Sequence, residues 1–235
     1  METRFYRRPR VESPSLVAAW PGMGYLAKIS AEYLRDSLRA DMFAEIVTYQ
    51  SVIRYVDGLA ELSFSRHRFY EAPDANLVIC VGDDQPLTAS ESVSLAEAVM
   101  DVAEELGVRM VYTMAAMPTG YEGEPRVYGI GNSVRSLRKL REHGIEVMRG
   151  EGGVSGLNGI LIGVAAKRGV DGVCLLGEIR YVDVPQFESA AYVLKVLTGM
   201  LGLTLDLSKL MRRAEEVKRM TKKGRVGGER LGYVS

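Results

Sequence analysis

The residues best suited to chemistry form a glycine-rich segment in the second half of the chain. Residues 150–159 read GEGGVSGLNG, with five glycines in ten positions. Glycines let several backbone N–H groups point at one anion, and the start of the helix predicted next adds a partial positive charge. The alternative is a tight backbone crossing or an interface contact. The candidate ligand-binding residues of this segment are Gly153, Ser155, Gly156, Asn158 and Gly159.

None of the familiar phosphate or nucleophile motifs is complete here. The segment lacks the Gly-Lys-Ser/Thr of a P-loop. It also lacks a Gly-x-Gly-x-x-Gly directly after a strand with an acidic residue about 20 positions later. Ser155 lies in GVSGL, where Leu157 takes the place of the second glycine of a nucleophile elbow. We therefore assign no catalytic residue, and the sequence favours a protein that is not an enzyme without deciding the point.

Four turns follow predicted strands, and three of them carry the remaining candidates, which are glycines and carboxylates. Ligands of open parallel sheets bind outside the carboxyl ends of the strands, so we expect turns 21–24, 82–86, 117–123 and 177–180 to meet at one edge. Adjacent carboxylates there could hold a cation or transfer protons. The alternative is that each segment is an ordinary turn. The candidates are Gly22, Gly24, Asp83, Asp84 and Glu178.

The histidines and cysteines predict neither a metal site nor a disulfide. His67 is flanked by two arginines in what looks like an exposed basic cluster, and His143 ends a predicted helix. Cys80 and Cys174 lie inside apolar, strand-like runs, which is typical of buried thiols in a reduced cytoplasmic protein. Two histidines and two cysteines, none at ligand spacing, lead us to expect no zinc and no cofactor.

Strands and helices alternate along the chain, which predicts an α/β fold with a mostly parallel sheet and helices on both faces. Apolar runs indicate strands at residues 15–20, 44–49, 58–64, 76–81, 109–115, 126–130, 145–148 and 172–176. Three- and four-residue spacing of apolar side chains indicates helices at 26–38, 88–106, 133–143, 157–168 and 186–201.

We predict one α/β domain over residues 1–206, followed by a C-terminal appendage over residues 207–235. The appendage begins with an amphipathic helix whose apolar face contains Leu207, Leu210, Met211, Ala214, Val217 and Met220. Glycines 224, 227 and 228 then interrupt it, and the rest is expected to be a mobile basic tail. The apolar face is equally compatible with binding a partner and with folding back on the body.

Thirty Lys and Arg residues balance thirty Asp and Glu residues, but the charges are unevenly distributed. Residues 1–10 carry four Arg and one Glu, and residues 209–235 carry nine Lys or Arg and three Glu. The basic ends therefore meet an acidic partner or fold back onto an acidic body. The tail has one aromatic residue, which argues against nucleic acid. No apolar run reaches the length of a membrane span and no secretory signal begins the chain, so we expect a cytoplasmic protein.

The candidate segments, taken in order, resemble the archaeal proteasome assembly chaperone family, whose members have often carried the label ATP-grasp superfamily. The resemblance rests on PGMG at 21–24, GDDQP at 82–86, GVSGLNG at 153–159 and LLGE at 175–178. It covers roughly residues 10–215. It implies a three-layer α/β fold resembling nucleoside phosphorylases, homo-oligomers, and in some members a role in assembling the proteasome core particle.

The resemblance also implies a docking element at the end of the chain. Some of these chaperones are thought to bind the proteasome α-ring through a C-terminal hydrophobic–Tyr–any tripeptide, by capture of the tail and its carboxylate. This chain ends LGYVS, so Tyr233 stands where the tripeptide has its hydrophobic residue and Val234 stands where it has tyrosine. Leu231, Tyr233 and Val234 are the candidate partner-binding residues.

Two functions follow from these observations. The first is a proteasome assembly chaperone-like homo-oligomer that acts by protein–protein interaction, with proteasome α-subunits as partners. The second is a phosphate- or nucleotide-binding protein or enzyme that uses residues 150–159, with Asp83, Asp84 or Glu178 as polar partners.

Overall fold

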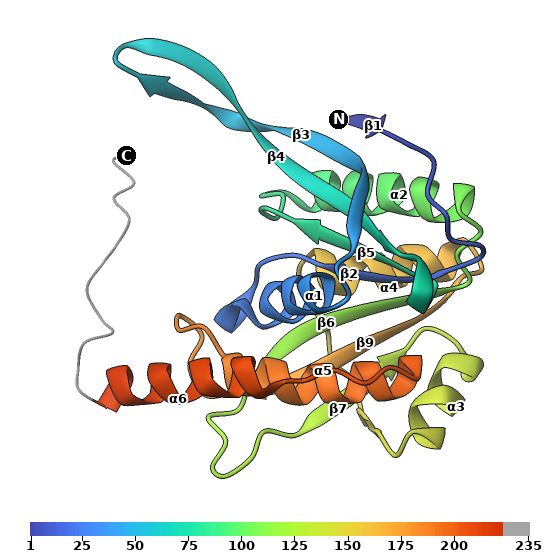
Figure 1. Ribbon diagram of the computed structural model, residues 1–235, viewed down its shortest axis with the longest axis vertical. Helices are drawn as coiled ribbons and strands as arrows, with labels where there is room; N and C mark the ends of the chain where they lie inside the picture. The colour runs from blue at the N-terminus through green and yellow to red at the C-terminus, as the bar shows by residue number, and fades with distance from the viewer. Residues whose placement is uncertain (223–235) are drawn as a thin grey trace.

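A mixed nine-stranded sheet organises the computed structural model, which describes residues 1–222 (Figure 1). The strand order is β1-β3-β4-β5-β2-β6-β9-β7-β8. The strands are β1 (Glu2–Phe5), β2 (Ser15–Ala19), β3 (Asp41–Val56), β4 (Leu59–Ala72), β5 (Leu77–Gly82), β6 (Met110–Pro118), β7 (Val127–Gly131), β8 (Glu146–Val147) and β9 (Asp171–Ile179). The helices are α1 (Leu26–Ser37), α2 (Ala89–Glu105), α3 (Val134–Glu142), α4 (Leu157–Lys167), α5 (Phe187–Leu201) and α6 (Ser208–Lys222).

The centre of the sheet is parallel, as the apolar runs predict. Strands β5, β2, β6 and β9 are neighbours, and each pairs in parallel with the next. Every residue of β5 is buried. A continuous apolar strand suits this position because helices cover both faces of it.

The flanks of the sheet contain antiparallel pairs, β1–β3–β4–β5 on one side and β9–β7 on the other, and here the prediction of a mostly parallel sheet is wrong. Among the described strand pairings, four are parallel and four are antiparallel. Short connections are the physical reason for two of the antiparallel pairs, β3–β4 and β4–β5, since a tight turn can join only antiparallel neighbours. Asp57 and Gly58 form such a turn between β3 and β4, with φ of +49° and +83°. Both strands run well beyond their predicted bounds.

Helices cover both faces of the sheet, in agreement with the sequence prediction. One apolar cluster joins α2 and α4 to the first face, and it contains Leu95, Val99 and Leu161. A second cluster joins α1 and α5 to the opposite face, with Leu34 and Leu194 among its members. A capping box at Thr88 and Glu91 begins α2, close to the predicted start.

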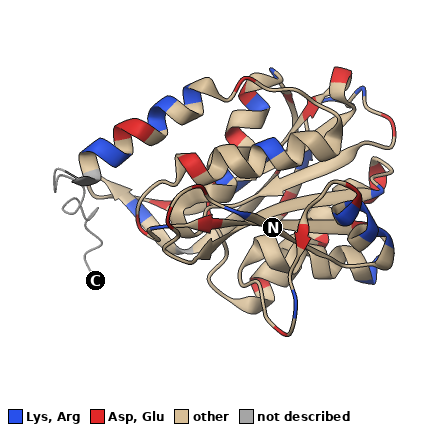
Figure 2. Cartoon of the chain, turned by 90° about the horizontal axis from the view of Figure 1, so that it is seen from below, with Lys and Arg blue, Asp and Glu red and all other residues tan. Residues whose placement is uncertain are grey.

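Helix α6 packs on α5 through the first part of its apolar face. Leu210 and Ala214 are buried, whereas Met220 is exposed. The Nζ atom of Lys218 donates a hydrogen bond to Glu188 on α5 at 2.8 Å. Figure 2 shows Lys and Arg along α6 with acidic residues between them. This part of the appendage folds back on the body, and the boundary at residue 206 stays a prediction. The candidates Leu231, Tyr233 and Val234 lie outside the described residues.

The basic N-terminal segment also folds back onto the body. Arg7 and Arg10 both form ion pairs with Glu71, whose side chain is fully buried on β4. Burial alone would raise the pKa of Glu71, but hydrogen bonds from the Arg10 backbone N–H and from the Arg7 side chain outweigh it and lower the pKa. The excess of arginine at the N-terminal end is therefore explained by ion pairs within the chain.

His67 is buried, contrary to the expectation of an exposed basic cluster. It is 0% exposed, while Arg66 and Arg68 on either side are partly exposed. The indole Nε1–H of Trp20 donates to His67 Nδ1 at 3.0 Å. Nδ1 therefore carries no proton, and the protonated Nε2 donates to Thr48 Oγ1, also at 3.0 Å. One side chain thus joins the residue after β2 to strands β3 and β4.

Gly82 leaves room for this contact, and we expect Gly82→Ala to destabilise the fold. A Cβ atom there would lie 2.0 Å from Trp20 Cδ1 and 2.8 Å from His67 Nδ1. Overpacking of this kind costs about 1–3 kcal/mol in the free energy of unfolding, which urea denaturation measures. Gly199→Ala is the matched control, because no atom lies within 4 Å of its added Cβ on α5. Equal stability of the two variants would contradict the close packing.

The His67 contact also predicts a loss of stability in mild acid. Burial lowers the pKa of His67 from 6.5 to about 4, so the unfolded chain binds the proton more tightly than the folded chain. Between those two pH values, falling pH destabilises the fold by up to about 3 kcal/mol through this group. The measurement is the unfolding free energy against pH for the wild type and His67→Gln, which does not titrate. Identical pH profiles would contradict the assignment.

Candidate functional site

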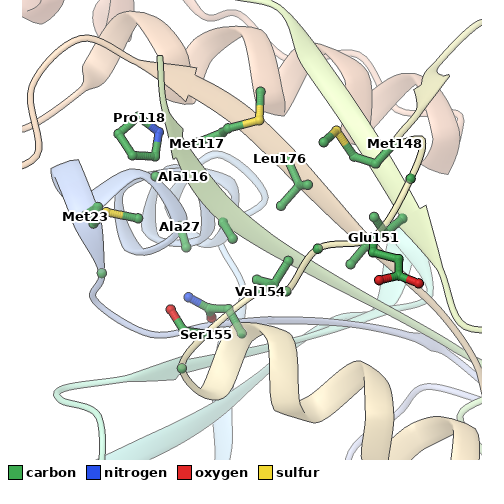
Figure 3. Close-up of a pocket in the computed structure, with 18 of the residues that line it drawn as sticks. Met23, Ala27, Ala116, Met117, Pro118, Met148, Glu151, Val154, Ser155 and Leu176 are labelled. Carbon is green, nitrogen blue, oxygen red and sulfur yellow. The ribbon is translucent and has the colours of Figure 1, made fainter. Parts of the chain in front are cut away.

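The four predicted turn segments meet at one edge of the sheet, at the carboxyl ends of β5, β2, β6 and β9. Residues 117–118 and 177–179 were predicted as turn but are the last residues of β6 and β9, because each strand continues further than its apolar run. The three parallel pairings between these strands bring their ends side by side. A cavity of about 510 Å³ lies at this edge. Figure 3 shows Met23, Ala116, Met117, Val154 and Ser155 around it, contributed by three separate segments of the chain.

The walls of the cavity are largely apolar. Three methionines line it, namely Met23, Met117 and Met148, together with Ala116 and Leu176. Methionine side chains are flexible and polarisable, so they adapt to apolar groups of different shapes. This lining suits an aliphatic or aromatic group of a ligand or of a partner protein.

The glycine-rich segment forms the remaining wall. Gly153, Ser155, Gly156 and Asn158 all line the cavity, as does Gly22 from the turn after β2. The structure therefore brings five of the ten candidate ligand-binding residues into one space. Among the residues that line the cavity, the charged side chains are Arg149 and Glu151, both exposed.

Gln85 ties three of the segments together, and the sequence analysis did not select it. Its Nε2 donates to the carbonyl oxygen of Pro21, and its Oε1 accepts from the backbone N–H of Leu157 at 2.7 Å. A Cβ at Gly156, whose φ is +77°, would lie 2.6 Å from that same Oε1. Gln85 lies in the GDDQP motif at 82–86, but the candidate residues selected from that motif were its two carboxylates.

The Gln85 amide also reduces the number of free backbone N–H groups that the start of α4 can donate to an anion. The Leu157 N–H points at Gln85, and the N–H groups of Gly159 and Ile160 both donate to Gly156 O at 3.0 Å. Helix N-termini bind phosphate through N–H groups that have no other partner. The geometry at this helix start thus favours internal bonding over phosphate binding.

Asn158 holds the backbone of Trp20 on the floor of the site. Its Oδ1 accepts from Trp20 N–H at 3.0 Å, and its Nδ2 donates to Trp20 O at 3.2 Å. The side chain is buried and both ends of its amide are occupied by this pair of bonds. Asn158 therefore positions the wall of the cavity by joining α4 to the end of β2.

Two further predicted glycines lie beside the cavity and shape the turns around it. Gly24, with φ of +61°, donates to Val182 O at 2.7 Å, and its carbonyl accepts from Gln186 N–H at 2.8 Å. A Cβ at Gly159 would lie 2.1 Å from Val154 O, so the turn that leads into α4 closes too tightly for a side chain. Neither glycine is among the residues that line the cavity.

The three predicted carboxylates are also outside the cavity lining. Asp83 pairs with Arg68 at 2.7 Å, and the Oδ1 atom of Asp84 accepts from the next backbone N–H, that of Gln85. The Oε2 atom of Glu178 accepts from Arg126 N–H at 2.9 Å, at the junction of β7 and β9. All three make structural contacts within the fold.

The cysteine thiols and the metal-ligating side chains are placed unfavourably for catalysis or metal binding. Cys80 and Cys174 are free and buried, and burial raises the pKa of Cys174 to about 12, so its thiolate is strongly disfavoured. Within residues 1–222, no three His, Cys, Asp or Glu side chains gather where they could hold a metal ion. Nor does that part of the chain contain a helix long and apolar enough to cross a membrane.

Two solved structures share this fold over nearly the whole chain. Pyrococcus furiosus PbaB, described as an archaeal proteasome activator, is 28% identical with a TM-score of 0.83, and the match covers 95% of this chain and 98% of that one. Pyrococcus furiosus PbaA, described as an archaeal homolog of proteasome-assembly chaperone, is 24% identical with a TM-score of 0.76. That match covers 95% of this chain and 96% of PbaA.

One relative also matches by sequence over most of the chain. An uncharacterised protein of Methanocaldococcus jannaschii, MJ1210, is 27% identical over 218 residues, which are 91% of this chain and 83% of that protein. The ATP-grasp label finds no support in these matches. The model of the PAC2 family matches residues 16–223, and the chain belongs to that family.

Proposed function

We propose that this chain is a proteasome assembly chaperone-like protein that acts as a homo-oligomer through protein–protein interaction. The observation that carries the proposal is the match to PbaB, which spans 95% of the chain at a TM-score of 0.83.

The cavity supports the same proposal. Its apolar, methionine-rich lining resembles the adaptable surfaces that accept side chains of partner proteins. The carboxylates that would serve a phosphate or a cation make structural contacts outside it. A site of this kind binds an apolar group and supplies no base–nucleophile pair among the residues that line it.

We infer that the partners are proteasome α-subunits in the cytoplasm, and that residues 231–235 take part in docking. A C-terminal segment can be held by capture of its carboxylate and of one or two side chains. Tyr233 would provide the large side chain even though its position differs by one residue from the tripeptide of the resembling family.

Truncation after Met220 tests the docking segment. We expect the full-length chain to retain proteasome α-subunits from a cell extract, and the truncated chain to lose them, because the carboxyl-terminal anchor is gone. Mass spectrometry of the retained proteins is the measurement. A full-length Tyr233→Ala variant keeps the length and charge of the chain, and we expect it to lose α-subunits as well, because the proposed anchoring side chain is removed. Failure of the full-length chain to retain α-subunits would contradict the proposed partner.

A small-molecule site in the cavity is the second candidate function. The specific observation in its favour is a space of about 510 Å³ that brings the glycine-rich segment together with the turns after β2 and β6. Small-molecule pockets commonly have this volume, with apolar walls and a few polar groups that fix orientation.

Thermal unfolding with added ligands tests this candidate. A ligand at 100 times its Kd stabilises the folded state by about 2.7 kcal/mol, which raises the Tm by several degrees. We expect millimolar ATP, ADP or inorganic phosphate to give no rise, because the start of α4 is already bonded internally. Ala116→Leu narrows the cavity, so it should abolish the stabilisation by a ligand that binds in the cavity and leave unchanged the stabilisation by a ligand that binds elsewhere. A rise with phosphate that this variant abolishes would contradict our preference for the first function.

A further inference from the structure

The longest projection of the molecule is the β3–β4 hairpin, which extends from the body at the upper left of Figure 1. Its outer part, residues 48–64, is called the arm here. β1 pairs with β3 only at residues 44–47, and β5 pairs with β4 only at residues 67–72. The arm is therefore a two-stranded ribbon with no other strand beside it in the described chain. Such ribbons are marginally stable alone in water.

One face of the arm is an apolar stripe. The register pairs Tyr49 with Phe64, Ile53 with Leu62 and Tyr55 with Ala60. Residues directly opposite each other share a face, and so do alternate residues of one strand, which places all six side chains on one side. The five large ones, all but Ala60, are between 48% and 74% exposed.

The area of the stripe is that of a protein interface. At somewhat more than 100 Å² each, the five large side chains expose on the order of 600 Å² of apolar surface. A typical monomer exposes no contiguous apolar patch larger than about 300–600 Å². A standard interface buries about 800 Å² on each partner, so the stripe with its margins is large enough for a stable dimer.

The order of residues along the stripe is self-complementary. An aromatic pair, Tyr49 and Phe64, lies at the base, the aliphatic pair Ile53 and Leu62 lies in the middle, and Tyr55 with the small Ala60 lies near the tip. Two antiparallel copies would place the base aromatics of one arm over the tip of the other. The small Ala60 leaves room there for the Phe64 ring of the partner.

The charges have the same symmetry. Asp57 at the tip lies four positions beyond Ile53, and Arg66 at the base lies four positions beyond Leu62 on the striped side. In an antiparallel pair centred on Ile53 and Leu62, each Asp57 lies beside an Arg66 of the other copy. The side chain of Arg66 is 41% exposed. Its Nε atom lies 3.9 Å from Glu45 Oε2, and its guanidinium stacks over Phe64 at 5.0 Å. The remaining charges of the arm, Arg54 and Glu61, pair with each other on the opposite face.

We propose that two copies of this chain associate arm against arm through this stripe, related by a two-fold axis at Ile53 and Leu62. Isologous contact of this kind requires one surface that complements itself, which the residue order and the charges provide. The proposal deepens the homo-oligomer of the proposed function by naming its surface.

Substitution on the stripe tests the contact. Tyr55→Glu and Leu62→Glu place charge in the proposed interface, and we expect each to weaken self-association about 30-fold or more in sedimentation velocity. Val134→Glu is the matched control, because Val134 on α3 is 75% exposed, like Tyr55 at 74%. Helix α3 packs beside β7, near the edge of the sheet opposite the arm. Unchanged self-association in both stripe variants, or a monomeric wild type at high micromolar concentration, would overturn the proposal.

A cross-linking experiment tests the axis without disrupting it. Leu62→Cys places two thiols near the axis, and we expect mild oxidation to join two chains by a disulfide. Val134→Cys should give no disulfide-linked dimer under the same treatment. Cys80 and Cys174 are buried and do not compete. Absence of the Leu62→Cys cross-link would overturn the two-fold arrangement.

Retention of proteasome α-subunits separates this inference from the proposed function. If Leu62→Glu loses self-association but retains α-subunits, the arm joins copies of this chain and the proposed function stands apart from it. If the variant keeps its oligomeric state and loses α-subunits, the stripe is a contact for the proteasome and the proposed dimer is wrong.

Discussion

The fold depends on the packing of Trp20 against Gly82 at the carboxyl edge of the sheet. The indole is fully buried, donates its N–H to His67, and has its backbone held by Asn158. A single residue thereby connects the end of β2 to β4, β5 and α4. Thr48 and His67 lie at the base of the arm, and Asn158 lines the cavity. The same buried contact therefore joins the two surfaces proposed as binding sites.

Hydrogen bonds to backbone atoms hold the cavity in shape. Gln85 and Asn158 each use both ends of an amide to join loops that are distant in sequence. Amides suit this task because each carries a donor and an acceptor at fixed separation and needs no counter-charge when buried. Polar hydrogen bonds thus hold the loops around the cavity in place, whereas apolar side chains line the cavity itself.

Much of the fold was predictable because local patterns agree with it. The apolar run predicted as a strand at 76–81 is β5 (Leu77–Gly82), which is buried and parallel to β2, and Thr88 caps the helix that follows. The length of the β3–β4 hairpin was not predictable, because its exposed arm carries apolar residues where an exposed strand normally has polar ones. His67 was misplaced because neighbours along a strand face opposite ways, so flanking arginines say nothing about its burial. The meeting of the four turns was predictable from parallel pairing, whereas the role of Gln85 depends on contacts 64 and 72 residues away.

The strand order also has a consequence for the time at which the sheet can form during synthesis. β2 is made early, but its two neighbours are β5 and β6, so the sheet around it stays incomplete until residue 118 has left the ribosome. β9, which completes the parallel centre, follows about sixty residues later. Chains that must wait for distant partners fold slowly and expose apolar strands in the meantime. A protein that resembles an assembly chaperone is thus itself dependent on late-arriving segments for protection of its own core.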